Sequence, residues 1–439
     1  MKRSNGNIEI EYLPRIEGHG AITVELDESG GVGNVKVDIP EAPRLFEALV
    51  RGKTPDEDLN MVPRVCGICS FSHKYAGIRA FEKALGVTPS EKAIALRTLL
   101  HLSETLQSNV LHVFFLSLPD LLGYPNAIEM ASDYKDAVLG AMKMKGFANK
   151  IMEIGSGRFV HGENPVIGGF GRYPTDQELA PLKSISQELI PQAEKAAEMI
   201  GEMEIPVFPE RDTTFMCLNP PTGEYGLVGD NVLISDGKEI PVENYKQLTN
   251  ERVVSHSFAK RSRYNGKPFT VGAIARINLL GDRLQGVAKK YYEKYYSGRW
   301  KKNPMFNIHA QALEILWTLQ AVYPIVDAIA EAEEPEEPIA KRTKATGKGS
   351  GAVEAPRGIL YHHYEVENGL IKNSDIITPT AQNLDDIEEF IKVTAANLIS
   401  SGDNDDIQAK LEMVARAFDP CVSCSVHLVR KRSEKHHQR

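Results

Sequence analysis

The chain has 439 residues, 42% of them hydrophobic and 25% charged, and its formal net charge is −8. This length allows two or three domains or one large fold, and the composition is that of an ordinary soluble globular protein. The negative charge argues against a nucleic-acid-binding surface, and no apolar run approaches the ~20 residues that span a bilayer. The polar N-terminus indicates no signal peptide, so we expect a cytoplasmic protein.

The N-terminal region, residues 7–40, predicts antiparallel β-structure. Apolar side chains alternate with polar ones over residues 22–26 and again over 35–39. Gly30 and Gly31 lie between these two runs, where a hairpin needs its turn.

Helices are predicted next. The spacing of Ile78, Phe81 and Leu85 predicts a helix that stops at Gly86. The following Thr88-Pro-Ser-Glu91 has the spacing of a capping box, and it would open a helix to about Leu118.

Two more helices are predicted before residue 205. One lies around Ala127–Met144, and the other starts at the capping box Thr175-Asp-Gln-Glu178 and runs to about Glu202. Together with the preceding helices they favour a long-helix bundle as the core.

The second half of the chain mixes short strands with helices. Residues 205–270 read as short β segments, with a hairpin turn at Ser235–Lys238. Residues 310–333 are helical, and Pro324 is expected to kink or split them. Residues 331–352 are rich in Glu, Pro, Lys and Gly, so we expect a solvent-exposed loop there.

Four of the five cysteines form two Cys-x-x-Cys pairs, Cys66 with Cys69 and Cys421 with Cys424. Thiolates bind soft or borderline metals, and two such pairs can supply a four-sulfur site. A structural zinc ribbon is the alternative, but its pairs usually lie ~15–20 residues apart. Here about 350 residues intervene, which favours a buried site where the whole fold converges. Cys217 stands alone and is expected to be a buried apolar side chain.

The two cysteine segments also carry a family resemblance. Arg-x-Cys-Gly-x-Cys-x-x-x-His at 64–73 and Asp-Pro-Cys-x-x-Cys-x-x-His at 419–427 resemble the paired signature of [NiFe] hydrogenase large subunits. The resemblance implies an α+β, mainly helical fold, with a long-helix bundle core and small antiparallel β regions at the N-terminus, in the middle and near the C-terminus.

The same resemblance implies one large-subunit domain over residues 1–439. Its expected parts are a β-rich N-terminal part (7–60), a helical core with the first cysteine pair (61–204), a mixed β and helical part (205–335), an exposed loop (336–353), a C-terminal part with the second cysteine pair (354–427) and a cleaved tail (428–439).

By resemblance, the four cysteines bind nickel and iron. Cys66 and Cys421 would be terminal ligands of nickel, while Cys69 and Cys424 would bridge nickel and iron. The remaining iron ligands would be CO and CN⁻. Splitting H₂ heterolytically needs a Lewis-acidic redox metal and a nearby base, and a terminal thiolate can take the proton.

Two motifs supply further catalytic candidates by resemblance. Glu17, in Arg15-Ile-Glu-Gly-His19, would pass protons away from a nickel-bound cysteine; a glutamate on a surface strand is the alternative. Arg357, in Glu354-Ala-Pro-Arg-Gly358, would lie over the metal pair, with Pro356 beside it. A guanidinium does not readily lose its charge, so it can polarise bound hydrogen.

A magnesium or other divalent ion is implied near the thiols. Its ligands would be Glu47, the backbone carbonyl of Ile376, and His427. Carboxylate oxygen suits this hard cation, although a carboxylate on a helix surface is the alternative for Glu47.

Three further side chains would line the site without binding metal: His73, Asp419 and Thr380, whose hydroxyl would hydrogen-bond a cyanide on iron. A direct metal-binding role is the alternative for His73. One position departs from the family, because many members carry an acidic residue where this chain has Ser108. Two other classes of protein are the alternatives: a metal-free homologue of a respiratory complex I subunit, and a zinc-binding scaffold.

Electrons leaving nickel need iron–sulfur clusters, and this chain has no further cysteine-rich segment. An iron–sulfur small subunit is therefore expected. The stretch Arg263–Arg276 resembles cytosolic bidirectional hydrogenases of the sulfhydrogenase type, which implies flavin/NAD(P)-binding and further iron–sulfur subunits. Coupling to a deazaflavin or to a heterodisulfide reductase is the alternative.

The last twelve residues, Leu428–Arg439, are strongly basic and almost without apolar side chains after Val429. Such a segment cannot pack into a core, whereas His427 would have to lie deep beside the metals. The family resolves this conflict by proteolysis after nickel insertion. We therefore expect cleavage at or just after His427 by a maturation endopeptidase that acts after nickel-insertion factors.

Overall fold

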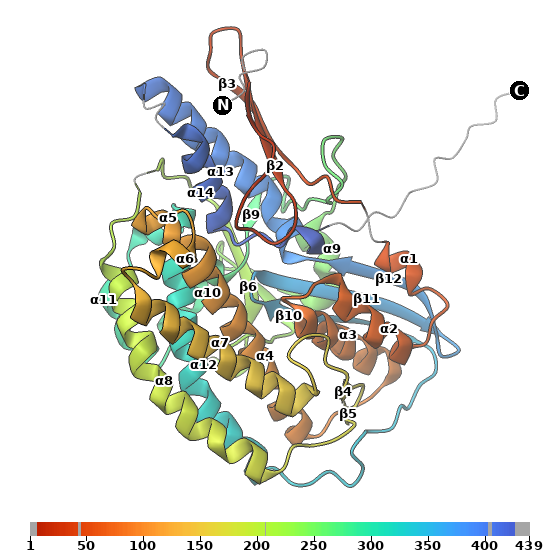
Figure 1. Cartoon of the computed structure of the whole chain (residues 1–439). Helices are drawn as coiled ribbons and strands as arrows, with labels where there is room; N and C mark the ends of the chain where they lie inside the picture. The colour runs from red at the N-terminus through yellow and green to blue at the C-terminus, as the bar shows by residue number, and fades with distance from the viewer. Residues whose placement is uncertain (1–6, 43–44, 207, 403–405, 426–439) are drawn as a thin grey trace, which may run out of the picture.

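The structure, a computed structural model, describes residues 7–42, 45–206, 208–402 and 406–425. Long helices and small sheets make up these parts of the chain (Figure 1). The α-helices are α1 (Phe46–Leu49), α2 (Pro55–Met61), α3 (Ser70–Leu85), α4 (Glu91–Leu111), α5 (Leu118–Leu122), α6 (Ala127–Met130), α7 (Lys135–Ser156), α8 (Asp176–Glu202), α9 (Tyr245–Thr249), α10 (Ala273–Leu280), α11 (Gly286–Tyr295), α12 (Asn307–Glu331), α13 (Pro379–Ser401) and α14 (Ile407–Ala417).

The described strands form four small sheets. They are β1 (Ile8–Ile10), β2 (Ala21–Leu26), β3 (Val32–Asp38), β4 (Pro165–Val166), β5 (Gly169–Phe170), β6 (Thr214–Asn219), β7 (Asn231–Ile234), β8 (Glu239–Pro241), β9 (Phe269–Thr270), β10 (Gly347–Ala355), β11 (Gly358–Glu367) and β12 (Leu370–Ile377). Their orders are β1-β2-β3, β4-β5, β8-β7-β6-β9 and β10-β11-β12. Only the β6–β9 pair among them is parallel. The expected β regions at the N-terminus, in the middle and near the C-terminus are thus confirmed.

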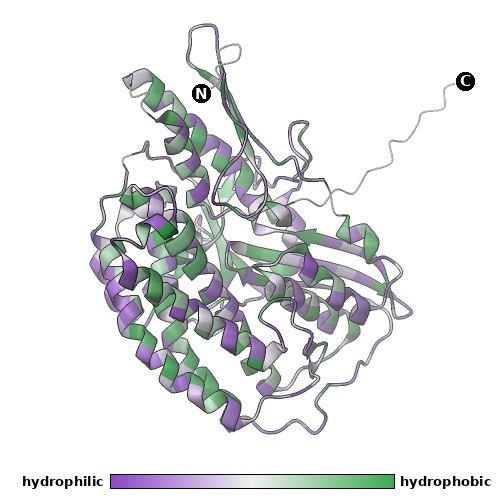
Figure 2. Ribbon diagram, viewed as in Figure 1, coloured by the Kyte–Doolittle hydropathy of each residue, from purple (hydrophilic) through white to green (hydrophobic). Residues whose placement is uncertain are grey.

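A bundle of long helices forms the core, as the sequence predicts. Helix α12 packs against α4, α8 and α11, and α7 packs against α4 and α8. Figure 2 shows hydrophobic and hydrophilic patches alternating along α7 and α8, because each helix buries one stripe and exposes the other. The segment Pro304–Glu331 is long and apolar enough to cross a membrane by composition, but it lies largely buried in this bundle.

Two of the predicted helices differ from those in the structure. Helix α4 begins at Glu91, not at Pro89, because the hydroxyl of Ser90 rather than that of Thr88 accepts a hydrogen bond from the first turn. The helical run then continues through a π-helical segment, His112–Ser117, into α5, so it reaches the predicted end at about Leu118. The helix predicted around Ala127–Met144 is two helices, since α6 stops at Met130 and α7 runs on to Ser156.

Helix α12 is not split at Pro324, which lies within one continuous helix. Pro324 is exposed, so its missing N–H and its ring lie on the solvent side. By contrast, α8 follows the prediction, with the Thr175–Glu178 capping box in place. The hairpin turn at Ser235–Lys238 joins β7 to β8, and Gly237 has a φ of 86° there.

The exposed loop predicted over 331–352, or 336–353 as a domain part, is wrong from Gly347 onwards. Residues Gly347–Ala355 form β10, which is buried over most of its length. Three alternate glycines face helix α3: a Cβ on Gly347, Gly349 or Gly351 would lie 2.1, 2.1 or 2.4 Å from the carbonyl oxygens of Ala84, Ala80 and Ala76, respectively. Glycine in this strand therefore marks close helix–sheet contact, not a loop.

Candidate metal centre

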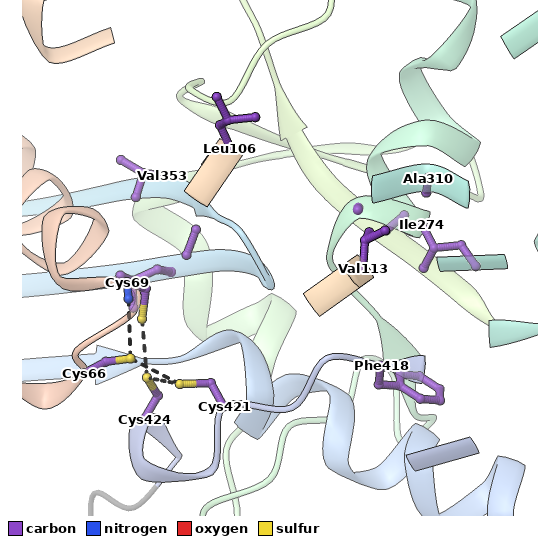
Figure 3. Packing of buried hydrophobic residues seen from close by; sticks show 14 of the residues in the cluster. Cys66, Cys69, Leu106, Val113, Ile274, Ala310, Val353, Phe418, Cys421 and Cys424 are labelled. Atoms are coloured by element: carbon purple, nitrogen blue, oxygen red, sulfur yellow. Dashed lines mark hydrogen bonds between the residues drawn. The ribbon is translucent and has the colours of Figure 1, made fainter. Parts of the chain in front are cut away.

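Four buried cysteine side chains meet where α3 begins and where the chain leaves α14. Cys66 follows the 3₁₀ turn Val62–Val65, and Cys69 immediately precedes α3. Cys421 immediately precedes the short turn Val422–Cys424 after α14, and Cys424 is the last residue of that turn. All four sulfur atoms lie within 4.8 Å of one another, and Figure 3 shows the two pairs facing each other.

The sulfur–sulfur distances exclude disulfides and fit a shared ligand. They are 3.3 Å for Cys66–Cys421, 3.4 Å for Cys69–Cys424 and 2.8 Å for Cys421–Cys424, whereas a disulfide needs ~2.05 Å. A buried, reduced four-sulfur set is a donor set for soft or borderline metals such as nickel and iron. The prediction that these cysteines converge is confirmed, and Cys217 is buried apart from them in β6.

The pKa values of the four thiols differ. Hydrogen bonds from the thiols of Cys421, Cys424 and Cys69 lower the pKa of Cys66 well below its usual value. Burial raises the pKa of Cys421 and that of Cys424. Binding of a metal would therefore release protons from these buried sulfurs.

The start of α3 is held by Glu104, which was not predicted from the sequence. This α4 side chain is buried and accepts hydrogen bonds from the backbone N–H groups of Phe71 (2.6 Å) and Ser72 (2.8 Å). It thus satisfies two N–H groups that a helix N-terminus leaves unpaired. Burial raises the pKa of Glu104 to about 7. A glutamate within a regular helix gives no sequence signal of this contact.

Glu17 lies directly against the second cysteine pair. The Sγ atom of Cys421 donates to Glu17 Oε2 at 3.2 Å, and the backbone N–H of Ser423 donates to the same oxygen at 3.0 Å. The backbone also pairs, since the N–H of Val422 donates to the Glu17 carbonyl at 2.9 Å. Glu17 belongs to no described strand, so the surface-strand alternative does not hold.

Arg357 lies in the turn between β10 and β11, and its side chain contacts Asp419, two residues before Cys421. Its Nε donates to the carbonyl oxygen of Asp419 at 2.8 Å and to Asp419 Oδ1 at 3.0 Å, and its Nη1 lies 3.4 Å from Ser108 Oγ. Both charged side chains are only 2% exposed. The attraction of Asp419 and the cysteines outweighs burial and raises the pKa of Arg357. Asp419 itself has a φ of 51°, a strained value for a non-glycine residue.

Two of the three residues expected to bind magnesium, Glu47 and Ile376, lie together, although the contact between them is made by the Ile376 N–H and not by its carbonyl oxygen. Glu47 is buried on α1, and its Oε1 accepts from the backbone N–H of Ile376 at 2.9 Å. The same oxygen lies 3.3 Å from Lys260 Nζ, a contact the sequence did not suggest, and Lys260 also pairs with Glu251. Burial raises the pKa of Glu47 against the opposing effect of Lys260. His427 falls outside the described residues.

The other predicted residues lie on segments next to the cysteines or to Arg357. His73 is fully buried, its Nδ1 lies 3.1 Å from His362 Nε2, and its own Nε2 has no hydrogen-bond partner among the described residues. Burial lowers the pKa of His73 to about 4, which keeps the ring neutral. Thr380 accepts a hydrogen bond from the backbone N–H of Cys421 at 2.9 Å. Pro356 contributes its carbonyl, which accepts from Arg276 at 3.0 Å.

Comparison with known proteins gives matches along nearly the whole chain. A family model described as nickel-dependent hydrogenase matches residues 44–138 and 232–427, and a HoxL-like model matches residues 7–42. The chain is 40% identical to the alpha subunit of sulfhydrogenase 1 from Pyrococcus furiosus, with 98% of this chain and all of that protein covered. It is 28% identical to a subunit of the vhc F420-non-reducing hydrogenase from Methanococcus voltae, covering 96% of this chain and 95% of that one.

Solved structures share the fold. A crystal structure of an NAD⁺-reducing [NiFe]-hydrogenase in its H₂-reduced state superposes with a TM-score of 0.87 at 28% identity, covering 96% of this chain and 99% of that chain. The Ni-Fe-Se hydrogenase of D. vulgaris Hildenborough superposes with a TM-score of 0.74 at 23% identity and the same coverage.

Proposed function

The chain belongs to the nickel-dependent hydrogenase family, and from that premise we propose that its four buried thiols form the hydrogen-activating centre of a catalytic large subunit. The observation that carries the proposal is the convergence of four reduced cysteines, from opposite ends of the sequence, within 4.8 Å. A metal-free homologue has no need of such a cluster, and a zinc scaffold explains neither the family match nor the ionisable groups around the sulfurs.

Cys66 and Cys421 would bind nickel, and Cys69 and Cys424 would bind nickel and iron together. A nickel–iron pair with CO and CN⁻ ligands supplies the Lewis-acidic, redox-active chemistry that heterolytic cleavage of H₂ requires. The chain itself provides the enclosure, since each of the four cysteines is at most 4% exposed. Exclusion of water strengthens every electrostatic interaction in the pocket.

Proton transfer is assigned to Cys421 and Glu17. Their Sγ–Oε2 distance of 3.2 Å is within reach for transfer of the thiol proton to the carboxylate. The N–H of Ser423 holds the receiving oxygen in place. Because Glu17 is only partly buried, it can pass the proton outward, which a fully enclosed thiol cannot.

Arg357 would act as a fixed positive charge beside the thiols. Its anchor on Asp419 leaves one guanidinium nitrogen, Nη2, without a well-aligned hydrogen bond among the described residues. Such a donor can orient a small ligand or polarise bound hydrogen. A divalent ion bound by Glu47, the Ile376 carbonyl and His427 would share the Glu47 carboxylate with Lys260.

We further propose that the electron acceptor is an iron–sulfur partner protein, because Cys217 is the only cysteine outside the centre. The relative with the higher identity is a sulfhydrogenase alpha chain, and a structural relative is NAD⁺-reducing, so we favour flavin/NAD(P)-binding and further iron–sulfur subunits. Coupling to a deazaflavin or to a heterodisulfide reductase is the second candidate. We also propose that the protein is cytoplasmic and that residues 1–439 make up one large-subunit domain.

A set of three variants tests the assignment. Cys421→Ser should abolish H₂-dependent dye reduction and lower the nickel content. Glu17→Gln should keep nickel and iron but slow H/D exchange by roughly 10²–10⁴-fold, the usual worth of an acid–base group. Cys217→Ala removes a buried cysteine outside the cluster and should keep both metals and turnover. Metal analysis of the purified holoenzyme and the exchange assay are read together, and a fully active Cys421→Ser protein would refute the site.

A further inference from the structure

Arg276, the last residue of the Arg263–Arg276 stretch, lies at the centre of a buried charge network. It is fully buried on α10, and so are the two carboxylates it contacts, Glu314 on α12 and Glu354 on β10. Its Nε and Nη2 bind the two oxygens of Glu314 at 2.5 and 2.8 Å, and its Nη1 binds Glu354 at 2.8 Å.

The remaining two N–H donors of Arg276 reach the backbone next to Arg357. Nη1 donates to the carbonyl of Ala355 at 3.2 Å, and Nη2 donates to the carbonyl of Pro356 at 3.0 Å. All five donors of the guanidinium are thus used. The side chain therefore clamps the two peptide groups that lead into Arg357.

The carboxylates that hold Arg276 are themselves held. Glu314 also accepts from Asn109 at 2.8 Å and from the Tyr225 hydroxyl at 2.7 Å. Glu354 also accepts from the backbone N–H of Leu218 at 2.7 Å. With partners on α4, α10, α12, β6 and β10, the network fixes Arg276 against the rigid core of the molecule.

The backbone of the Arg263–Arg276 stretch also packs against the turn between β10 and β11 that carries Arg357. Gly272 has a φ of 112°, and a Cβ there would lie 3.0 Å from the carbonyl oxygen of Arg357. Gly358 has a φ of 132°, and its Cβ would lie 2.4 Å from Val271. The segment Val271–Arg276 is therefore packed directly behind the turn that carries Arg357.

We infer that Arg276 is a positioning residue, which acts through the backbone at Ala355 and Pro356 to set Arg357 beside Asp419 and the thiols. The inference rests on the proposed function only for the catalytic role of Arg357. Lysine cannot replace this arginine, because a single ammonium lacks the planar fork that spans four acceptor groups.

The structural test compares crystal structures of wild type, Arg276→Lys and Arg261→Lys. Arg261 is a matched control, since it is equally buried but holds Asp385, Glu388 and the Val37 carbonyl. In Arg276→Lys the Arg357 guanidinium should leave Asp419, whereas in Arg261→Lys it should stay. An Arg357 that keeps its place in Arg276→Lys would overturn the inference, whether or not the enzyme holds metal.

The kinetic test is a double-mutant cycle on purified holoenzyme, normalised to nickel content. Arg276→Lys should slow H/D exchange about 10- to 100-fold, as a misplaced catalytic group does. In an Arg357→Lys background the same change should cost about twofold or less, because both residues act through one group. Equal losses in both backgrounds would contradict the inference. Arg261→Lys should change the H/D exchange rate by the same factor in the wild-type and in the Arg357→Lys background.

A second variant keeps the test decisive if Arg276→Lys does not fold. Glu314→Gln weakens the same clamp while keeping side-chain volume, and it should show a smaller loss with the same dependence on Arg357; an equal loss in both backgrounds would overturn the inference. If the purified wild-type protein neither binds nickel nor exchanges hydrogen, the proposed function fails, and the crystallographic comparison still decides the role of Arg276.

Discussion

At the residue scale, burial shifts the pKa values of several ionisable side chains and so determines whether they carry a proton. His73 is kept neutral, with a pKa of about 4, and Glu104 has a pKa raised to about 7. Asp58, on α2, is completely buried, and its carboxylate oxygens have no aligned hydrogen-bond partner among the described residues. Burial raises its pKa to about 8, against the smaller opposing effect of the Tyr364 hydroxyl.

The acidity of Asp58 predicts a pH-dependent stability. The folded state keeps a proton up to about pH 8 that the unfolded chain releases near the ordinary value of 3.8. Because the native state binds more protons in this window, its stability falls as pH rises, by up to about 1.4 kcal/mol per pH unit from this one group. Asp58→Asn, which is always neutral, should match wild type near pH 4 and exceed it at pH 8 in thermal denaturation.

The control for this prediction is Asp56→Asn on the exposed side of the same helix. It removes an exposed carboxylate that pairs with Arg342, so it should not become more stable than wild type between pH 4 and pH 8, whereas Asp58→Asn should. A difference between wild type and Asp58→Asn that does not grow from pH 4 to pH 8 would show that Asp58 is ionised in the folded protein.

At the element scale, the contact between α3 and β10 sets the position of the first cysteine pair. Helix α3 starts directly after Cys69 and lies on the sheet through Ala76, Ala80 and Ala84. The alternate glycines of β10 let the helix backbone approach the strand more closely than any side chain would allow. The height of the helix above the sheet therefore depends on residues far from the thiols in sequence.

Gly349→Ala should destabilise the protein. The new Cβ would lie 2.1 Å from the carbonyl oxygen of Ala80, which is helix backbone and cannot rotate away. Overpacking of this kind costs about 1–3 kcal/mol, and because α3 must shift, nickel content should fall with it. Denaturant unfolding and metal analysis measure the two effects.

A glycine with open space provides the matched comparison. Gly146 lies within α7, and a Cβ there meets nothing within 4 Å, so Gly146→Ala should be neutral or stabilising by up to about 1 kcal/mol. Equal stabilities for the two alanine variants would mean that the β10–α3 contact tolerates a side chain.

At the scale of the whole molecule, the centre is closed by the two ends of the sequence. Glu17, near the N-terminus, pairs through its backbone with the segment Cys421–Val422, and Ser425 is 1% exposed. The last described residue is therefore still in the interior of the molecule. Residues 426–439 lie outside the described part, so the expected cleavage stays a prediction.

The intact mass of the active protein tests the expected cleavage after His427. The nickel-loaded, active protein should lack Leu428–Arg439, because a charged twelve-residue segment cannot follow a ligand into a dry core, while protein made without the maturation endopeptidase should retain them. Active enzyme that still ends at Arg439 would contradict this. A chain truncated after His427 by a stop codon separates the act of cleavage from the presence of the tail.

The sequence by itself determined the chemistry and much of the architecture. The spacing within each Cys-x-x-Cys pair, the order of the motifs and the 3.6-residue periodicity of the long helices are local, so they could be read without coordinates. The predictions that Glu17, Arg357 and Asp419 are neighbours of the thiols came from the resemblance, and their positions agree with it. Elsewhere local patterns misled: the glycine-rich segment from Gly347 suggested a loop.

Only the tertiary structure decided how these motifs are held. Glu104, Lys260 and Arg276 touch the centre or its supports, yet each is an ordinary charged residue in sequence, because the partners that bury it are distant: Arg276 meets Pro356 80 positions away. Strand β10 forms because it pairs with β11 along its whole length and packs on the backbone of α3, not because of its own propensity. Which polar groups are buried and paired depends on packing across the whole chain, and packing is not encoded in any single segment.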